Sequence, residues 1–250
     1  MLNVRNCKHI RSFSRDELTA FLAANAGSLV EDEAIAVLDN LNVTSAMCQT
    51  IARTPHLAAF NSVRLRLVQN RVTPLTHSVK LVHYLSWPDL LRLSVDVTVP
   101  AQVRRAIDSQ LLIRLETLAL GEKIAAAKRC SAALIKVFLF DPDPAIFASL
   151  LVNARLREED LLVLAASDRA SAEKLRFLAA DPKWSFRYAI RRTLAMNPST
   201  PRAAAASQLR FLTRRDLRDI HDHPATSIYL RRCIERLAPA VFAREAERID

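Results

Sequence analysis

Glycine is almost missing from this chain of 250 residues, which contains only Gly27 and Gly121. Sheet-rich folds need many tight turns, and most of those turns use glycine. Aromatic residues are also scarce, at 6% of the chain, whereas the helix-favouring residues alanine, leucine and arginine are abundant. These two shortages argue against a sheet-rich protein and predict an all-α fold.

The chain also lacks the cysteine pairs of a redox or zinc motif. Its four cysteines are Cys7, Cys48, Cys130 and Cys233, with no C-x-x-C spacing among them. We expect them to be small buried hydrophobic residues in a reducing compartment. Residues 1–13 lack the apolar core of a signal peptide, and the longest apolar runs are short and interrupted by charge. We therefore expect a cytoplasmic protein with no membrane partner.

Sequence motifs for catalysis or phosphate binding are absent, including G-x-S-x-G, the P-loop, G-x-G-x-x-G and H-E-x-x-H. The best metal candidate is the pair His221 and His223, but no further ligand lies at zinc spacing. We interpret this pair as a polar helix end. The sequence thus predicts no metal site, no small-molecule cofactor and no enzymatic activity.

A long internal repeat is the main positive feature. Residues 51–110 align without a gap on 178–237, at an offset of 127 residues, with 13 identities in 60 positions. Both copies contain the pattern N-x-x-T-P, beginning at Asn70 and Asn197. Apolar residues in the repeat follow helical spacing, and prolines or turn residues interrupt them every 10 to 20 positions. We predict roughly fifteen short helices.

Residues at the helix starts repeat as well. Thr73 and Thr200 each precede a proline, so we predict that they are N-caps with the proline at the first helical position. Capping boxes are predicted where Ser86 and Thr213 lie three residues before an aspartate. Another, Ser14-x-x-Glu17, is predicted to open a terminal helix.

Segments such as 51–74, 138–153 and 179–201, with the motif D-P-x-x-x-hydrophobic-R, resemble HEAT-like α-solenoid repeats of the bacterial type that includes leucine-rich-repeat variants. The resemblance implies one right-handed α-solenoid domain, built from helix pairs and with a concave binding face. Its divisions are predicted as an N-terminal cap (1–30), a first half (31–110), middle helices (111–159), a second half (160–237) and a C-terminal cap (238–250).

Basic residues are concentrated in the repeated segments. The chain has a net charge of +10, and residues 178–237 alone carry twelve lysines and arginines against five acidic residues. A basic stripe along a solenoid could bind a phosphate backbone or an acidic protein. The candidate residues are Arg187, Arg191, Arg192, Arg210, Arg214, Arg215, Arg218, Arg231 and Arg232.

The alternative for these arginines is structural. The pairs Arg64/Arg191 and Arg104/Arg231 recur in both copies, as side chains that satisfy helix ends or neighbouring aspartates would. Few aromatic residues lie among the arginines in sequence, which argues against base stacking on single strands.

Three hypotheses for the function follow. The first is a non-catalytic scaffold that binds a protein partner, and the second is sequence-independent binding of duplex nucleic acid. The third comes from the resemblance, because HEAT-like alkylpurine DNA glycosylases are also basic and all-helical. The residues that would serve such an enzyme are Trp87, Asp89, Trp184, Arg187 and Tyr188. Asp89 is also explained as a helix cap, and Trp184 as a core residue aligned with Leu57.

Overall fold

The computed structural model describes residues 3–25 and 27–239, and within these ranges the chain is all-α with no strand. The fold class predicted from the shortage of glycine is therefore confirmed. The chain divides into two compact units, Met1–Leu118 and Ala119–Asp250. Part of each predicted cap, namely residues 1–2, 26 and 240–250, lies outside the described residues.

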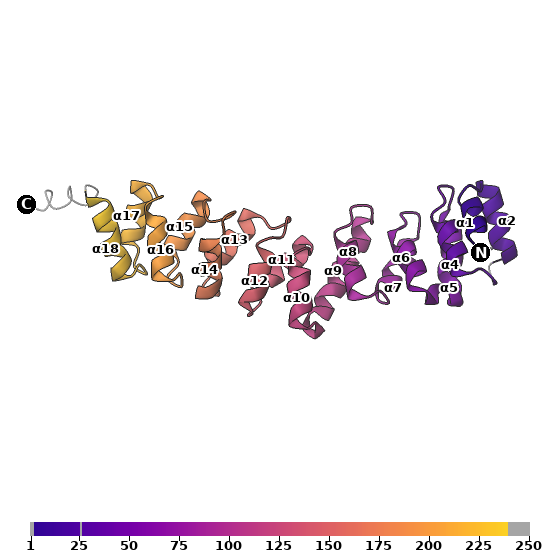
Figure 1. Cartoon of the computed structure of the whole chain (residues 1–250), viewed down its shortest axis with the longest axis horizontal. Coiled ribbons are helices and arrows are strands. Elements are labelled where there is room, and N and C mark those ends of the chain that lie inside the picture. Colours follow the sequence, from indigo (N-terminus) through magenta and orange to yellow (C-terminus); the bar gives the residue numbers. More distant parts are fainter. Residues whose placement is uncertain (1–2, 26, 240–250) are drawn as a thin grey trace, which may run out of the picture. The chain divides into compact units, whose positions relative to one another are not determined.

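The described part of the first unit consists of short helices joined by tight turns (Figure 1). These helices are α1 (Asn3–Ile10), α2 (Arg15–Asn25), α3 (Glu31–Leu38), α4 (Ser45–Arg53), α5 (Pro55–Ala59), α6 (Asn61–Gln69), α7 (Leu75–Val82), α8 (Trp87–Ser94), α9 (Ala101–Arg114) and the 3-10 turn η1 (Leu115–Thr117).

Helices of the first unit pack in two layers. In one layer α1 packs on α3 and α3 packs on α6, and in the other α7 packs on α9. Contacts of α6 with α7 and of α8 with α9 join the layers. The chain thus passes from one layer to the other between α6 and α7 and between α8 and α9, where the helices bury their apolar faces against their neighbours.

The second unit has the same construction. Its helices are α10 (Leu120–Ala127), α11 (Ala132–Phe138), α12 (Pro144–Leu150), α13 (Glu158–Ala165), α14 (Ala172–Ala180), α15 (Tyr188–Met196), α16 (Arg202–Leu209), α17 (Arg214–Asp222) and α18 (Ile228–Leu237). One layer contains α13, α15 and α17 in succession, and α16 packs on α18 in the other. With eighteen α-helices in the described residues, the expected fifteen was too few.

Helix boundaries recur at the offset found in the sequence. The bounds of α3, α4, α6 and α7 become those of α13, α14, α15 and α16 when 127 is added. The one helix lost is α5, whose counterpart at residues 182–186 is a series of turns. There the side chain of Asp181 accepts hydrogen bonds from the backbone N–H groups of Lys183 and Trp184. This side-chain turn competes with helix formation.

The N-x-x-T-P pattern has a different structural meaning from the one predicted. Pro74 and Pro201 are themselves the N-cap residues of α7 and α16, so each helix begins one residue later than expected. The Thr73 and Thr200 hydroxyls cap nothing, because both side chains are buried and neither hydroxyl accepts a hydrogen bond from a backbone N–H group. The predicted threonine caps are therefore wrong.

Asparagine is the structural residue of this pattern. The side-chain amide of Asn197 donates to the carbonyl of Ala165 at 2.6 Å, and its Oδ1 accepts from the backbone N–H of Ser199 at 2.8 Å. Asn40, Asn70 and Asn153 make the same pair of contacts, one to an earlier carbonyl and one to the N–H two residues ahead. Each asparagine thus closes its own turn and ties it to the previous one.

The predicted capping boxes are present in modified form. Ser86 and Thr213 each accept a hydrogen bond from the N–H group three residues ahead, as predicted. In both cases the aspartate accepts from the capping hydroxyl, whereas a full capping box uses the backbone N–H of the cap. Ser14 and Glu17 form the reciprocal box in full.

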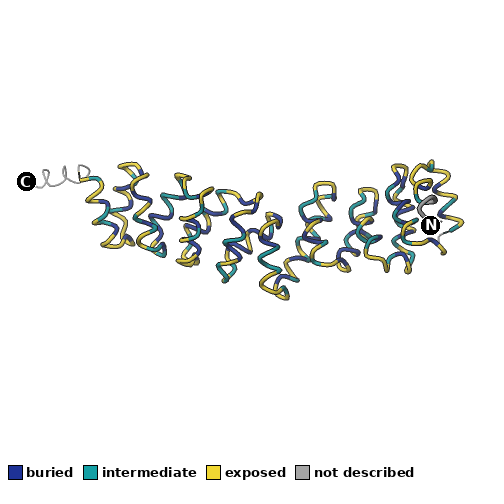
Figure 2. Tube along the Cα trace, viewed as in Figure 1, coloured by how far each residue is buried: buried dark blue, intermediate teal, exposed yellow. Residues whose placement is uncertain are grey.

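Buried positions alternate with exposed ones along each helix (Figure 2). Cys48 and Cys130 are fully buried, as expected, whereas Cys7 and Cys233 are only partly buried. All four cysteines are free thiols. Within the described residues, no helix combines the length and the apolar character needed to cross a bilayer.

Candidate functional site

Arg191 is held in place by contacts that recur in the other half of the repeat. Its Nε donates to the carbonyl of Ser185 at 2.7 Å, and its guanidinium carbon lies 3.7 Å from the ring centre of Phe211. Arg64, its counterpart, makes the same hydrogen bond to the carbonyl of Ala58 and lies over the ring of Tyr84. This recurrence indicates a structural role for one edge of each guanidinium.

Arg231 and its counterpart Arg104 also share an environment. The Nε atoms of both arginines are buried without a hydrogen-bond partner. A terminal nitrogen of Arg231 donates to the carbonyl of His223 at 3.1 Å, at the end of α17. Such a contact satisfies a free carbonyl at a helix C-terminus, which is the structural alternative considered for these residues.

Arg192 neutralises two acidic residues of the next helix in its layer. Its Nε lies 2.7 Å from Oδ1 of Asp216, and a terminal nitrogen lies 3.7 Å from Asp219. The hydroxyl of Tyr188 donates to the same Asp216 carboxylate. This hydrogen bond, followed by those from Thr213 and Arg192, lowers the pKa of Asp216. In the first unit Asn61 and Asp89 occupy the equivalent positions and are also hydrogen-bonded.

Arg187, the N-cap residue of α15, forms a long ion pair with Glu158, at 3.8 Å. Its guanidinium carbon also lies 5.3 Å from the ring centre of Phe186, a ring that is 55% exposed. Because the ion pair is long and the arginine is exposed, much of its charge remains available to solvent.

Three candidates lie together where α16 ends and α17 begins. Arg210 is exposed and lies 4.6 Å from the ring centre of Phe211, on which Arg191 also packs. Arg214 and Arg215 are exposed and form the first two residues of α17. Within the described residues none of these three has an acidic partner. The helix dipole disfavours cations at these first positions, so Arg214 and Arg215 do not stabilise α17.

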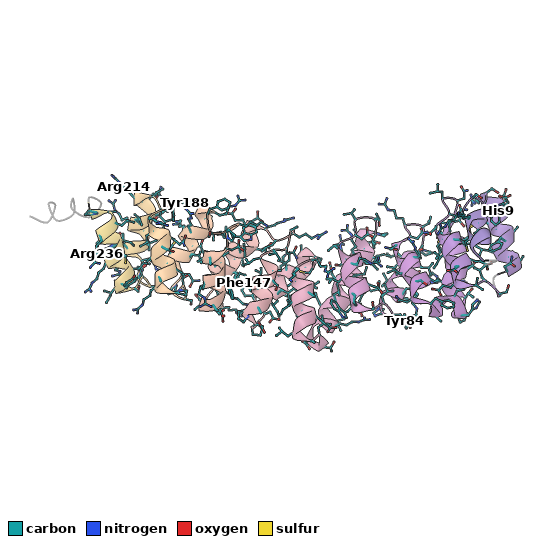
Figure 3. All side chains as sticks on the ribbon, in the orientation of Figure 1. His9, Tyr84, Phe147, Tyr188, Arg214 and Arg236 are labelled. Atoms are coloured by element: carbon teal, nitrogen blue, oxygen red, sulfur yellow. The ribbon has the colours of Figure 1, made fainter. Side chains whose placement is uncertain are left out.

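We call this region the arginine–aromatic edge, comprising Phe186, Arg187, Tyr188, Arg191, Arg210, Phe211, Arg214 and Arg215. The hydroxyl of Tyr188 accepts a hydrogen bond from the N–H of Thr213 at 3.1 Å, which joins the start of α15 to the start of α17. Figure 3 shows Tyr188 and Arg214 on the same side of the second unit.

Other candidates lie elsewhere. Arg231 lies beside the C-terminal end of α17, and the exposed Arg232 follows it on α18. A helix of nine residues separates that end from Arg214 and Arg215. Arg218 is exposed and lies midway along the same helix, where it has contacts of its own. The structure therefore gathers five of the nine predicted arginines and leaves four outside the edge, namely these three and the ion-paired Arg192.

Of the aromatic residues of the edge, sequence reasoning named Tyr188 only for the glycosylase hypothesis and missed Phe186 and Phe211. Phe186, Tyr188 and Phe211 are 55%, 43% and 42% exposed, and they lie among the arginines although few aromatics interleave with them in sequence. The signal available was the repeat itself, because Tyr84 and Phe211 occupy equivalent positions. Arginines already lie against Phe186 and Phe211.

Two of the residues considered for a glycosylase have structural roles. Trp184 is buried, and its indole N–H donates to the carbonyl of Leu151 at 3.3 Å, which confirms the expected core position. Asp89 accepts hydrogen bonds from Ser86 and Asn61 near the start of α8, where it acts in capping. Trp87 and Asp89 belong to the first unit, while the other three candidates belong to the second.

His221 is engaged by acidic neighbours. Its Nδ1 lies 2.9 Å from Asp222 and its Nε2 lies 3.1 Å from Glu235. The hydrogen bond to Asp222, and then the one to Glu235, raise the pKa of His221. In the described part of the chain, no group of three or more ligating side chains is arranged to hold a metal ion.

Comparisons with protein-family models, with curated proteins and with solved structures each found no match.

Proposed function

We propose that this chain is a non-catalytic binding protein of HEAT-like helical repeats, and that the arginine–aromatic edge binds an acidic segment of a protein partner. The two packed helix layers in each unit and the recurring helix bounds support stacked helix pairs in two related halves. The repeat architecture supplies a surface and implies no particular chemistry.

The observation that carries the proposal is the placement of Arg214 and Arg215. They are exposed, lack acidic partners within the described residues and occupy helix positions that disfavour cations. Neither residue has an arginine as its counterpart, because Trp87 and Pro88 stand at the equivalent positions in the first half. The repeat therefore gives no structural reason for these two charges.

Arginine stacking on aromatic rings favours a protein partner over single-stranded nucleic acid. The rings of Phe186 and Phe211 already carry guanidinium groups, which compete with nucleic-acid bases for the ring faces. Their contacts with the rings fix the orientation of the Arg191 and Arg210 guanidinium groups. The N–H groups of a guanidinium can donate two parallel hydrogen bonds to the oxygens of a carboxylate. Binding of a duplex backbone would use a continuous stripe of basic residues. Arg231 and Arg232 are separated from the edge, so the basic stripe predicted from the sequence is interrupted.

The test compares two labelled probes, decaglutamate and a DNA duplex of about 20 base pairs, by fluorescence anisotropy at low and at physiological salt. We expect decaglutamate to bind, and the double variant Arg214→Glu, Arg215→Glu to weaken it at least about tenfold. The matched control is Arg202→Glu, because Arg202 is also exposed but lies at the start of α16.

Duplex binding that persists at physiological salt and is lost in the same double variant, without binding of decaglutamate, would replace the protein partner with duplex DNA. Equal loss in the Arg202→Glu control would show that only the net charge of the protein is sensed. The first result would refute the acidic protein partner but keep the site, and the second would refute the site.

A further inference from the structure

A groove of about 380 Å³ lies on the first unit, between the region of α5 and the helix α7. Its floor and sides are mostly small or apolar residues, and its charged and aromatic residues come from α6, α7 and the turn after α7. The lining residues are Ala52, Pro55, Ala58, Ala59, Arg64, His77, Lys80, Leu81 and Tyr84.

The two halves of the repeat differ in sequence at this groove. Ala59 stands where the second half has Phe186, at the offset of 127 residues. The methyl group of Ala59 leaves space that a phenyl ring would occupy. Arg64 and Tyr84 form one wall of the groove. They pack on each other as Arg191 and Phe211 do in the second half.

The charges around the groove are all of one sign. Arg64 and Lys80 line it, together with His77, and no acidic residue is among the lining residues. Lys80 is exposed and has no ion-pair partner within the described residues. Arg64 uses its Nε for the carbonyl of Ala58, and its terminal nitrogens make no further hydrogen bond there. The ring of Tyr84 is 66% exposed.

We infer that this groove binds an acidic peptide segment of a partner protein, with one apolar side chain seated between Ala59 and Tyr84 and flanking carboxylates on Arg64 and Lys80. The apolar floor of the groove can bury one apolar side chain of the peptide. The two cations have no acidic neighbours, so they can bind carboxylates on either side of that side chain. Corresponding positions in the second half are Ser207 for Lys80 and Ala204 for His77, so these charges are not required by the repeat.

The experiment uses the full chain in an Arg214→Glu, Arg215→Glu background, so that the arginine–aromatic edge does not contribute. The probe is a fluorescein-labelled peptide, Glu-Glu-Leu-Glu-Glu, compared with Gln-Gln-Leu-Gln-Gln and Glu-Glu-Ser-Glu-Glu. We expect only the first to bind well, with each of the others weakened about tenfold.

Two substitutions taken from the second half then test the location. Ala59→Phe fills the groove, and we expect it to abolish binding. Lys80→Ser removes a cation, and we expect a loss of about tenfold. Matched controls are Ala203→Phe and Lys136→Ser, at exposed positions in the second unit, which are expected to leave binding unchanged.

Binding that survives Ala59→Phe, or that is lost equally in Ala203→Phe, would overturn the inference. So would the absence of binding of the acidic leucine peptide up to about 1 mM. Because the background already lacks the two arginines of α17, these outcomes are independent of the outcome for the arginine–aromatic edge.

Discussion

Tyr188, the first residue of α15, donates a hydrogen bond to Asp216 near the start of α17, 28 residues later. Asn61 donates to Asp89 across the same separation in the first unit, at 3.1 Å. Two different side chains thus make the same connection, between the starts of neighbouring helices in one layer. The tyrosine carries in addition an exposed ring that belongs to the arginine–aromatic edge.

The substitution Tyr188→Phe tests this contact. It removes the hydroxyl that donates to Asp216 and accepts from Thr213, and we expect the free energy of unfolding to fall by about 1 kcal/mol. Urea denaturation at neutral pH measures the change. Tyr229→Phe is the matched control, because Tyr229 is exposed and its hydroxyl has no hydrogen bond within the described residues. Equal effects of both substitutions would contradict the role given to Tyr188.

The lowered pKa of Asp216 predicts the acid dependence. Because its pKa in the folded protein lies below the ordinary value of 3.8, the unfolded chain binds the proton more readily. The stabilisation is present above the ordinary pKa and is lost as the pH falls through the folded value. Tyr188→Phe removes the hydrogen bond that contributes most to the lowered pKa of Asp216. We therefore expect this variant to lose less stability on acidification than the wild type. Unfolding free energies at pH values from about 6 down to about 2 give the comparison.

Asn197 is expected to be among the most sensitive polar residues. Replacement with alanine leaves the carbonyl of Ala165 without its donor and opens the turn, so we expect a loss of about 2–3 kcal/mol. Asn197→Asp separates the two contributions, since a carboxylate still accepts from Ser199 but cannot donate to Ala165. If the aspartate variant is as stable as the wild type, the bond to Ala165 contributes nothing.

His221 predicts a pH dependence of the opposite sign. Its pKa is raised above 6.5 by the hydrogen bond to Asp222 and then by that to Glu235. The stabilisation is complete below the unfolded value and is lost as the pH rises through the folded one. We expect an NMR titration to place His221 above 6.5, and Glu235→Gln to lower its midpoint. Glu116→Gln, at an exposed residue of η1, should not change it.

Lys174 is a buried cation in the second unit, 3% exposed, with Met47 at its counterpart position. Its Nζ donates to the carbonyls of Leu139, at 2.9 Å, and Asp141. Lys174→Met keeps the apolar volume but leaves both carbonyls without this donor, so we expect a loss of about 2 kcal/mol at neutral pH. Urea denaturation of the variant and the wild type measures the loss. An unchanged stability would show that the two hydrogen bonds only offset the burial of the charge.

The pH dependence of Lys174 follows from its burial, which lowers its pKa from the ordinary value of 10.5. Between the folded pKa and 10.5 the unfolded chain binds more protons, so this residue makes stability rise with pH in that window. Lys174→Met removes the rise. Denaturation at several alkaline pH values, compared between variant and wild type, shows whether it does.

The fold was predictable because it depends on repeated, local features. Scarce glycine and helical spacing predicted an all-α chain, and the alignment of 51–110 on 178–237 located equivalent helices to the residue. Helix starts were less certain, since Thr73 matches an N-cap in sequence but is buried, with Pro74 as the cap. Sequence patterns do not show which of two adjacent polar residues a helix end uses.

The candidate site was predictable only in part. The recurrence of Arg191 and Arg231 in both halves correctly raised a structural role, and their contacts with backbone carbonyls agree with it. The approach of Phe186, Tyr188 and Phe211 to the arginines depends on which turns meet in space. The groove at Ala59 is lined by residues between Ala52 and Tyr84, which come together only when these helices pack.

The asparagine contacts have a kinetic consequence. Asn40 reaches Ile10 over 30 residues and Asn197 reaches Ala165 over 32, so each tie spans about one helix pair. Short spans need little loop closure before a native contact forms, and chains with such local contacts fold quickly. Each unit can then nucleate at any of its helix pairs and grow by adding the next, and its terminal pairs are the first to open.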